Sequence, residues 1–204
     1  MDGDLKATDA APAPSGVGTP DGRRHRGRRW LVEWVVVVVA AVAVALVVRT
    51  FVFETYYIPS GSMEPTLEPG DRIVVDKLSF HMHPVERGDI VVFRRPPAWP
   101  KQYPDLVKRV IGLPGETIGA HGGNVYIDGH LLREPWLARG VTTGVCGSGT
   151  GSFGPVQIPA GDYFVMGDNR ADSADSRCYG PVPGRDIVGE VIFRYWPLSH
   201  IGVP

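Results

Sequence analysis

The chain has 204 residues, a formal net charge of −1, and 26 Gly and 19 Pro. Average usage would give roughly 24 residues of these two types together, so the excess argues against a helical bundle and favours short strands joined by turns. The near-zero charge gives no reason to expect a nucleic-acid partner. Two Cys are too few for a disulfide scaffold, and they lack the CxxC spacing of a zinc site.

The first 53 residues combine a polar tail, a basic block and an apolar segment. Residues 1–29 are mostly small or polar and end in a block of five Arg, which predicts a disordered tail. An unbroken apolar run at 34–48, with its flanks, makes residues 30–53 long enough for a single transmembrane helix. Because basic residues flank membrane spans on the cytoplasmic side, the tail is predicted to be cytoplasmic and residues 54–204 extracytoplasmic.

Two alternatives remain for the apolar segment. A cleaved signal peptide has the same basic start and apolar centre, but the small-x-small sequences at 41–45 lie inside the apolar run. A buried core helix is the other alternative, although five consecutive Val at 35–39 leave no amphipathic face. An uncleaved anchor in the cell membrane is the preferred interpretation.

Residues 54–204 predict a mainly β domain without long helices. Short runs rich in β-branched and aromatic residues alternate with turn signals such as Pro-Gly and Asp-Gly. The Gly-, Ser- and Thr-rich stretch at 140–154 predicts a flexible loop. The expected strands are residues 72–75, 89–94, 106–111, 124–127, 163–166 and 187–195.

The usual signatures of metal and cofactor chemistry are missing from the sequence. His81 and His83 have no third ligand nearby, and no HExxH or dinucleotide-binding Gly motif occurs. The nucleophile elbow GxSxG is absent, and neither Cys has the context of a nucleophile. The sequence therefore predicts neither a metal nor a cofactor.

A pair of hydroxyls directly follows the apolar segment. Ser60 and Ser62 are two residues apart, so in an extended stretch their side chains point to the same side. Gly61 between them permits close approach of another backbone. This arrangement suits a nucleophile with a second hydroxyl for a developing oxyanion. An ordinary Ser/Gly turn is the alternative.

Lys108 is the candidate base because it interrupts the apolar run at 106–111. In a strand it shares a face with Leu106 and Val110, and burial there disfavours the ammonium form. A lysine base near neutral pH needs its pKa lowered by about three units. The alternative is a side chain that extends to the surface.

Four motifs, in this order, resemble those of bacterial type I signal peptidases. They are PSGSMEPTL at 59–67, RGDIVVF at 87–93, KRVIGLPGE at 108–116 and GDNRADSADSR at 167–177. The resemblance implies a membrane-anchored Ser/Lys peptidase with an antiparallel β-sheet, signal-peptidase-like (LexA-like) catalytic domain. It also implies that residues 117–166 form at most a small second subdomain.

The resemblance assigns roles to individual residues. Ser62 is the implied nucleophile and Lys108 its general base, while the Ser60 hydroxyl and the Ser62 backbone N–H form the oxyanion hole. Ser173 is implied to orient Lys108 by a hydrogen bond. Structural support of the site falls to Asp168, Arg109, Asp175 and Arg177. Many members carry Asp where this chain has Ala171, so either Asp172 takes over the role of that Asp or the role is unfilled in this chain.

Cys146 and Cys178 lie 32 positions apart and would both face an oxidising compartment. A disulfide would tie the Gly-rich loop to the last motif, with two free thiols as the alternative. Only five residues separate Phe53 from Pro59, which places the site close to the bilayer. Phe80, Trp99 and Tyr103 are then expected at the membrane interface, or else as ordinary loop aromatics.

The expected partners are the lipid bilayer and exported preproteins with small residues at the third and first positions before the cut. A self-cleaving repressor-type Ser/Lys peptidase is a poor alternative, because residues 1–53 hold no DNA-binding domain. A catalytically inactive, membrane-tethered β-domain that only binds peptides is the alternative from a different functional class. The sequence leaves the oligomeric state open.

Overall fold

The computed structural model describes residues 22–101 and 103–204, and the side chains of 22–29 and 47–51 are not among those described. Residues 1–21, which belong to the predicted disordered tail, lie outside the described residues. The chain divides into two compact units, residues 1–44 and 45–204.

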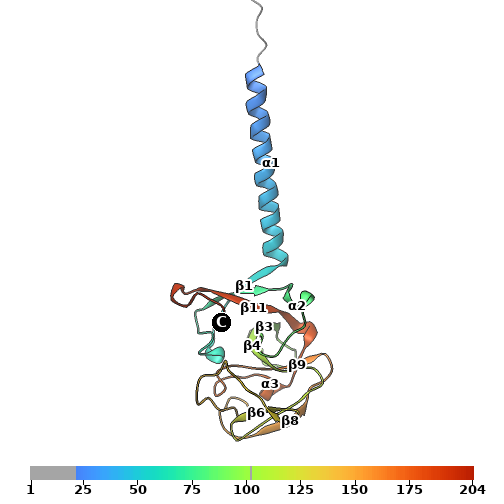
Figure 1. Ribbon diagram of the computed structural model, residues 1–204, viewed down its shortest axis with the longest axis vertical. Helices are drawn as coiled ribbons and strands as arrows, with labels where there is room; N and C mark the ends of the chain where they lie inside the picture. Colours follow the sequence, from blue (N-terminus) through green and yellow to red (C-terminus); the bar gives the residue numbers. More distant parts are fainter. Residues whose placement is uncertain (1–21, 102) are drawn as a thin grey trace, which may run out of the picture. The chain divides into compact units, whose positions relative to one another are not determined.

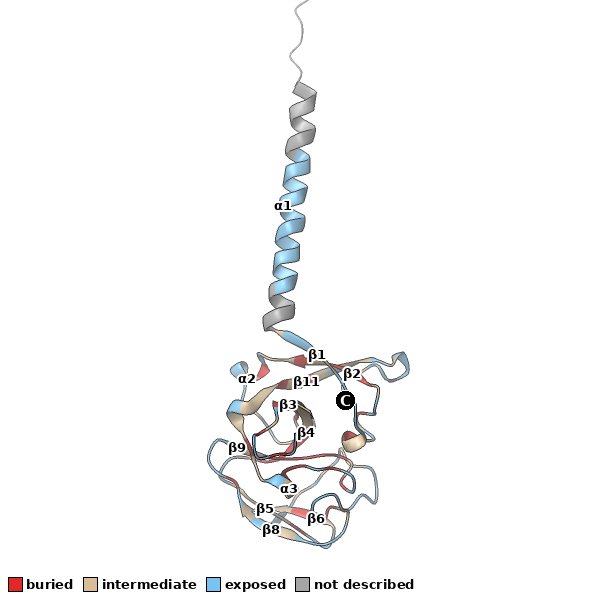
Figure 2. Ribbon diagram, turned by 180° about the vertical axis from the view of Figure 1, so that it is seen from behind, coloured by how far each residue is buried: buried red, intermediate tan, exposed pale blue. Residues whose placement is uncertain are grey.

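The first helix, α1 (Gly22–Phe51), begins earlier than the sequence predicted. The basic block at 23–29 lies within it and not in a disordered tail, which is consistent with the high helix propensity of Arg. Side chains at 30–46 are all exposed (Figure 2). Among the described residues, no helix combines the length and apolar character needed to cross a membrane. The transmembrane span at residues 30–53 stays a prediction.

A seven-stranded antiparallel sheet forms the centre of the second unit, with strand order β1-β2-β11-β3-β4-β9-β10 (Figure 1). The mainly β, antiparallel fold class is therefore confirmed. β11 lies between β2 and β3 and so joins the two halves of the sheet. The strands are β1 (Phe53–Tyr57), β2 (Arg72–Asp76), β3 (Ile90–Arg94), β4 (Asp105–Gly112), β9 (Asp162–Met166), β10 (Val182–Pro183) and β11 (Ile187–Trp196).

A smaller antiparallel sheet with the order β7-β6-β5-β8 falls within the predicted subdomain range 117–166. Its β6 and β8 lie at the opposite end of the second unit from β1 (Figure 1). β8 begins inside the stretch predicted as a flexible loop. The strands are β5 (Thr117–His121), β6 (Asn124–Ile127), β7 (His130–Leu131) and β8 (Phe153–Gln157).

The described helices that follow α1 are single turns. They are the α-helices α2 (Ser79–Met82) and α3 (Ser176–Tyr179) and the 3-10 helices η1 (Gly61–Met63), η2 (Gly184–Asp186) and η3 (Leu198–His200). Of these, η1 carries Ser62, and α3 begins within the last motif. The predicted absence of long helices after Phe53 therefore agrees with the described part of this unit.

Three apolar clusters hold β3 and β4 in place. One packs Met63 and Leu67 against β2 and β3, so the Ser62 segment is anchored in the core. The second fills the space between the two sheets, and the third packs Val91 and Val110 against Trp99. Trp99 is only 3% exposed and packs inside the protein, while its expected position near the membrane interface stays a prediction. Burial of each large apolar side chain contributes about 1.5–3 kcal/mol, which makes this part of the sheet a rigid support.

Candidate active site

Ser60 and Ser62 lie together at the start of η1. Ser60 has extended backbone angles, and the chain then turns into the 3-10 helix Gly61–Met63, so the predicted extended stretch ends at Ser60. The hydroxyls nevertheless lie 3.4 Å apart. Met63 is almost fully buried directly after Ser62 and fixes the turn to the core.

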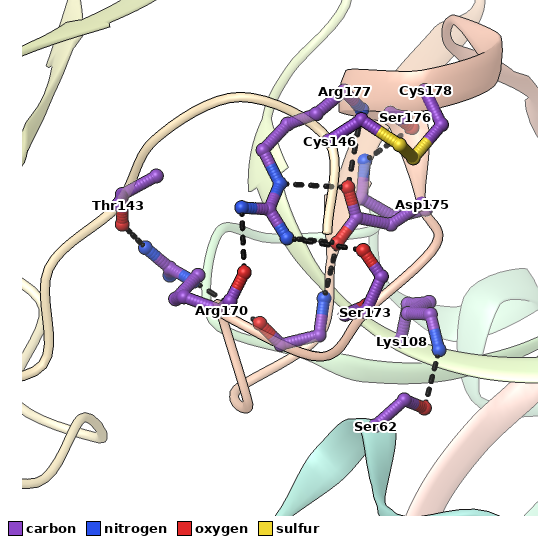
Figure 3. Close-up of polar contacts among 12 residues, drawn as sticks. Ser62, Lys108, Thr143, Cys146, Arg170, Ser173, Asp175, Ser176, Arg177 and Cys178 are labelled. Carbon is purple, nitrogen blue, oxygen red and sulfur yellow. Dashed lines mark hydrogen bonds and ion pairs between the residues drawn. A yellow bond between two sulfur atoms is a disulfide. The ribbon is translucent and has the colours of Figure 1, made fainter. Parts of the chain in front are cut away.

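Lys108 projects from β4 toward Ser62 (Figure 3). Its Nζ lies 2.6 Å from Ser62 Oγ, and the residue is only 4% exposed, so the side chain does not extend to the surface. Desolvation by burial lowers the pKa of Lys108 from 10.5 to about 8, with a further lowering from Arg177 and a partial offset from Asp175 and Asp168. A substantial fraction of the amine is therefore neutral just above neutral pH and can accept the Ser62 proton.

Asn169 fixes the backbone around the nucleophile, a role that the sequence analysis did not assign. Its side-chain Nδ2 donates to the Gly61 carbonyl at 3.0 Å, and its backbone N–H donates to the Ser62 carbonyl at 3.2 Å. These two bonds join η1 to the last motif. The position of Asn169 within the Gly-Asp-Asn-Arg sequence was the signal from which this role could have been predicted.

Ser173 does not make the predicted hydrogen bond to Lys108. It is 2% exposed, and among the described residues its Oγ has no hydrogen-bond partner. Figure 3 shows Lys108 directed at Ser62, with no interaction drawn to the Ser173 side chain. Ser173 packs instead against Gly167, where an added Cβ would overlap both the Ser173 hydroxyl and the Ser62 carbonyl oxygen. Gly167 is thus required for the close approach of these segments.

Arg109 and Asp168 form a buried, bidentate ion pair beneath the site. Arg109 donates to the two carboxylate oxygens at 2.9 and 2.7 Å and to the Gly88 carbonyl at 2.7 Å. Thr66 Oγ1 also donates to Asp168, at 2.5 Å. The pair therefore links the second, third and fourth motifs to the first motif, which carries Ser62.

Asp175 and Arg177 form a second fixed pair (Figure 3). Arg177 donates to the Asp175 carboxylate at 2.9 and 2.8 Å, and the Gly167 backbone N–H donates to the same carboxylate at 3.0 Å. Arg177 also donates to the Arg170 carbonyl at 2.8 Å. These contacts close the last motif into one loop beside Lys108.

A third buried pair, Arg170 with Glu134, was not predicted. Arg170 is 1% exposed and also donates to Thr143 and to the Gly167 carbonyl. Glu134 lies in a stretch without a recognisable motif, so the sequence held no signal for this partner. The pair joins the last motif to the segment that connects β7 and β8 of the small sheet.

Cys146 and Cys178 form a disulfide with their Cα atoms 4.8 Å apart. The bond joins the Gly-rich loop to α3 (Figure 3).

Asp172, the expected substitute for an acid at position 171, is exposed, and its carboxylate has no ion pair or hydrogen bond within the described residues. Within the described ranges, no group of three His, Cys, Asp or Glu side chains is placed so that it could hold a metal ion.

A cleft of about 60 Å³ opens beside Ser62 and Lys108. One wall is the segment from Tyr56 to Met63, and the other is formed by Tyr103 and the first half of β4. Both hydroxyls and the lysine line it, so a bound chain within the cleft meets the reactive groups directly.

Comparison with known proteins gives consistent matches over most of the chain. The model of the family described as signal peptidase, peptidase S26, matches residues 31–196. Signal peptidase I of Leptolyngbya laminosa is 43% identical, with 84% of this chain and 83% of the relative covered. Signal peptidase I of Bacillus caldolyticus is 42% identical over 87% and 95%, and that of Mycobacterium tuberculosis is 36% identical over 98% and 86%. The chain belongs to the signal peptidase S26 family.

Proposed function

We propose that this chain is a membrane-anchored serine endopeptidase that removes signal peptides from exported preproteins after small-x-small sites. The observation that carries the proposal is the 2.6 Å approach of the buried Lys108 amine to the Ser62 hydroxyl. Burial of a lysine beside a serine weakens the ammonium form and leaves a base in contact with a nucleophile. The S26 family membership supports the same reaction.

In the proposed mechanism neutral Lys108 takes the Ser62 proton as Ser62 Oγ attacks the carbonyl carbon of the scissile bond. The Ser60 hydroxyl and the Ser62 backbone N–H donate to the oxyanion that develops. The Lys108 ammonium then gives its proton to the departing amine, and an acyl-enzyme remains. Lys108 next takes a proton from a water molecule that attacks the ester, and it returns this proton to Ser62 Oγ as the ester bond breaks, which releases the signal peptide with a free carboxylate and regenerates the Ser62 hydroxyl.

The dimensions of the cleft support the preference for small side chains. A cavity of about 60 Å³ holds only a few water molecules. An extended substrate placed between the Tyr56–Met63 segment and β4 would add a strand there, and its alternate side chains would point into this space. Ala and residues of similar size fit such a space, whereas large side chains do not.

The location that we propose is the cell membrane, with a cytoplasmic N-terminus and an extracytoplasmic catalytic domain. Support comes from the apolar run at 34–48 and the basic block that precedes it. The exposed side chains of residues 30–46 are consistent with this, since apolar helices exposed all round are unusual in water.

The first test uses the detergent-solubilised chain and a preprotein with an Ala-x-Ala site. Wild type is expected to cleave after the second Ala, and Ser62→Ala is expected to leave the preprotein intact. Ser152→Ala, which changes an exposed serine outside the site, should cleave like wild type. Binding of the preprotein by well-folded wild type without any product would instead favour the tethered peptide-binding domain.

Activity should rise with pH, because Lys108 must be neutral to act as a base. With the pKa of Lys108 lowered to about 8, kcat/KM should increase about tenfold per pH unit below that value and level off above it. The measurement is kcat/KM for one peptide between pH 6 and 9.5. A flat profile across this range would argue against Lys108 as the base.

A further inference from the structure

A second cavity, of about 440 Å³, opens beyond Ser62 and shares no lining residue with the catalytic cleft. Its walls are Glu64 and Pro65, the last motif at 168–171, and parts of the Gly-rich loop. Three charged residues line it. Asp168 is paired with Arg109, and Arg170 is paired with Glu134, so Glu64 supplies the net charge of this cavity.

The Glu64 carboxylate lies against the backbone between the two active-site serines. A Cβ built on Gly61 would be 2.7 Å from Glu64 Oε1 and 3.2 Å from Oε2. The residue is half-buried, and within the described part of the chain its carboxylate makes no hydrogen bond or ion pair. An acid so close to the reacting groups, and with no partner, is available to a substrate.

The positions of the two cavities indicate which part of a substrate meets Glu64. The catalytic cleft is lined by the segment from Tyr56 to Met63 and by β4, whereas the second cavity begins at Glu64 and is otherwise lined by the Gly-rich loop and the last motif. A peptide that fills the cleft with the residues before the scissile bond then continues toward Glu64 with the residues after it.

We propose that Glu64 is a specificity-determining residue, which disfavours acidic side chains and favours basic ones at the first two positions after the scissile bond. The inference rests on the proposed function. Two unit charges several ångströms apart in a half-exposed cavity change binding about threefold to tenfold. The preference should weaken with added salt, because the Debye length falls from about 10 Å at 0.1 M to 3 Å at 1 M.

The test uses the full chain in detergent and three preproteins that share one Ala-x-Ala site and differ only after the cut, with Lys, Ala or Asp there. Wild type should cleave the Lys preprotein about tenfold faster than the Asp preprotein, measured as kcat/KM. Glu64→Gln should bring the ratio close to one, and Glu64→Lys should invert it. Glu68→Gln, an exposed acid on the same segment, should keep the wild-type ratio.

The outcomes separate this inference from the function on which it rests. No cleavage of any of the three preproteins by wild type would mean that the proposed function fails. Cleavage of all three with a ratio near one, or a ratio that Glu64→Gln leaves unchanged, would overturn the role of Glu64 alone. If the Glu64 variants fold poorly, loss of the wild-type ratio between 0.05 and 1 M salt supports the charge effect, and a salt-independent ratio overturns it.

Discussion

Lys108→Met is expected to abolish cleavage and, at the same time, to stabilise the folded chain at neutral pH. Met fills a similar volume in the buried site but cannot accept the Ser62 proton. General-base catalysis contributes about 10²- to 10⁴-fold to a rate, and a missing base also removes the second step. We therefore expect kcat/KM to fall by at least about 10³-fold.

The gain in stability follows from the pKa of Lys108. Its value falls from 10.5 to about 8 on folding, so below pH 8 the native state carries the full cost of burying this amine. At about 1.36 kcal/mol per unit, this cost is roughly 3 kcal/mol. The unfolded chain binds the extra proton between pH 8 and 10.5, so wild type gains stability as pH rises through this window. The advantage of the Met variant should shrink correspondingly.

Both halves of this prediction can be checked on one set of samples. Urea unfolding at pH 7 and pH 9.5 gives the difference in free energy of unfolding, and a preprotein assay gives the activity. Lys101→Met, which removes an exposed lysine outside the site, should change neither quantity. A Met variant that is less stable than wild type at pH 7 would show that Lys108 is not a desolvated amine.

Asp168→Asn is expected to destabilise the chain by about 3–5 kcal/mol, because the substitution removes one partner of a buried ion pair. Arg109 would keep its charge in a site where it is 6% exposed and where the carboxylate took two of its hydrogen bonds. An amide has one accepting oxygen, and its NH2 group would face the other donor, so Asn cannot accept all three hydrogen bonds that Asp168 receives from Arg109 and Thr66. Activity should fall as well, since the adjacent Asn169 holds the Gly61 and Ser62 carbonyls.

The matched control is Asp172→Asn, four positions further along and exposed. Its free energy of unfolding should stay within about 0.5 kcal/mol of wild type. Comparable effects of the two substitutions would mean that the Arg109–Asp168 pair adds nothing beyond a surface charge. Thermal or urea unfolding at pH 7 gives both values.

The central strands were predictable because they alternate or run as short β-branched stretches between Gly turns. β2, β3, β4, β9 and β11 all match expected ranges to within two residues. β1 and β8 were not predictable, because their sequences FETYY and FGPVQ carry no clear alternation of apolar and polar residues. These two strands owe their conformation to pairing with β2 and β5. Tertiary pairing, which a single sequence does not display, decided these two strands.

The residues of the site also divide into those that the sequence predicts and those that only the fold brings together. Local chemistry made the Ser60/Ser62 pair and Lys108 candidates, since a hydroxyl pair and a lysine within an apolar strand are unusual, and the family resemblance selected Ser62 as the nucleophile. The partner of Arg170 was not, because Glu134 has no distinctive neighbours and only the fold brings the two together. The Ser173 hydroxyl was assigned to Lys108 by resemblance, but it packs against Gly167 and has no hydrogen-bond partner among the described residues.

The place of β11 in the main sheet has a consequence for when activity first arises. Ser62 follows β1, and Lys108 lies on β4, but the halves of the sheet that carry them are joined only through the last strand of the chain. A polypeptide truncated before residue 187 lacks that strand, so that only contacts outside the sheet, such as those of Asn169 and Thr66, would remain between the two halves. Assembly of the Ser62–Lys108 pair is thus expected to depend on the pairing of β11, so that activity should arise only after residues 187–196 have been made.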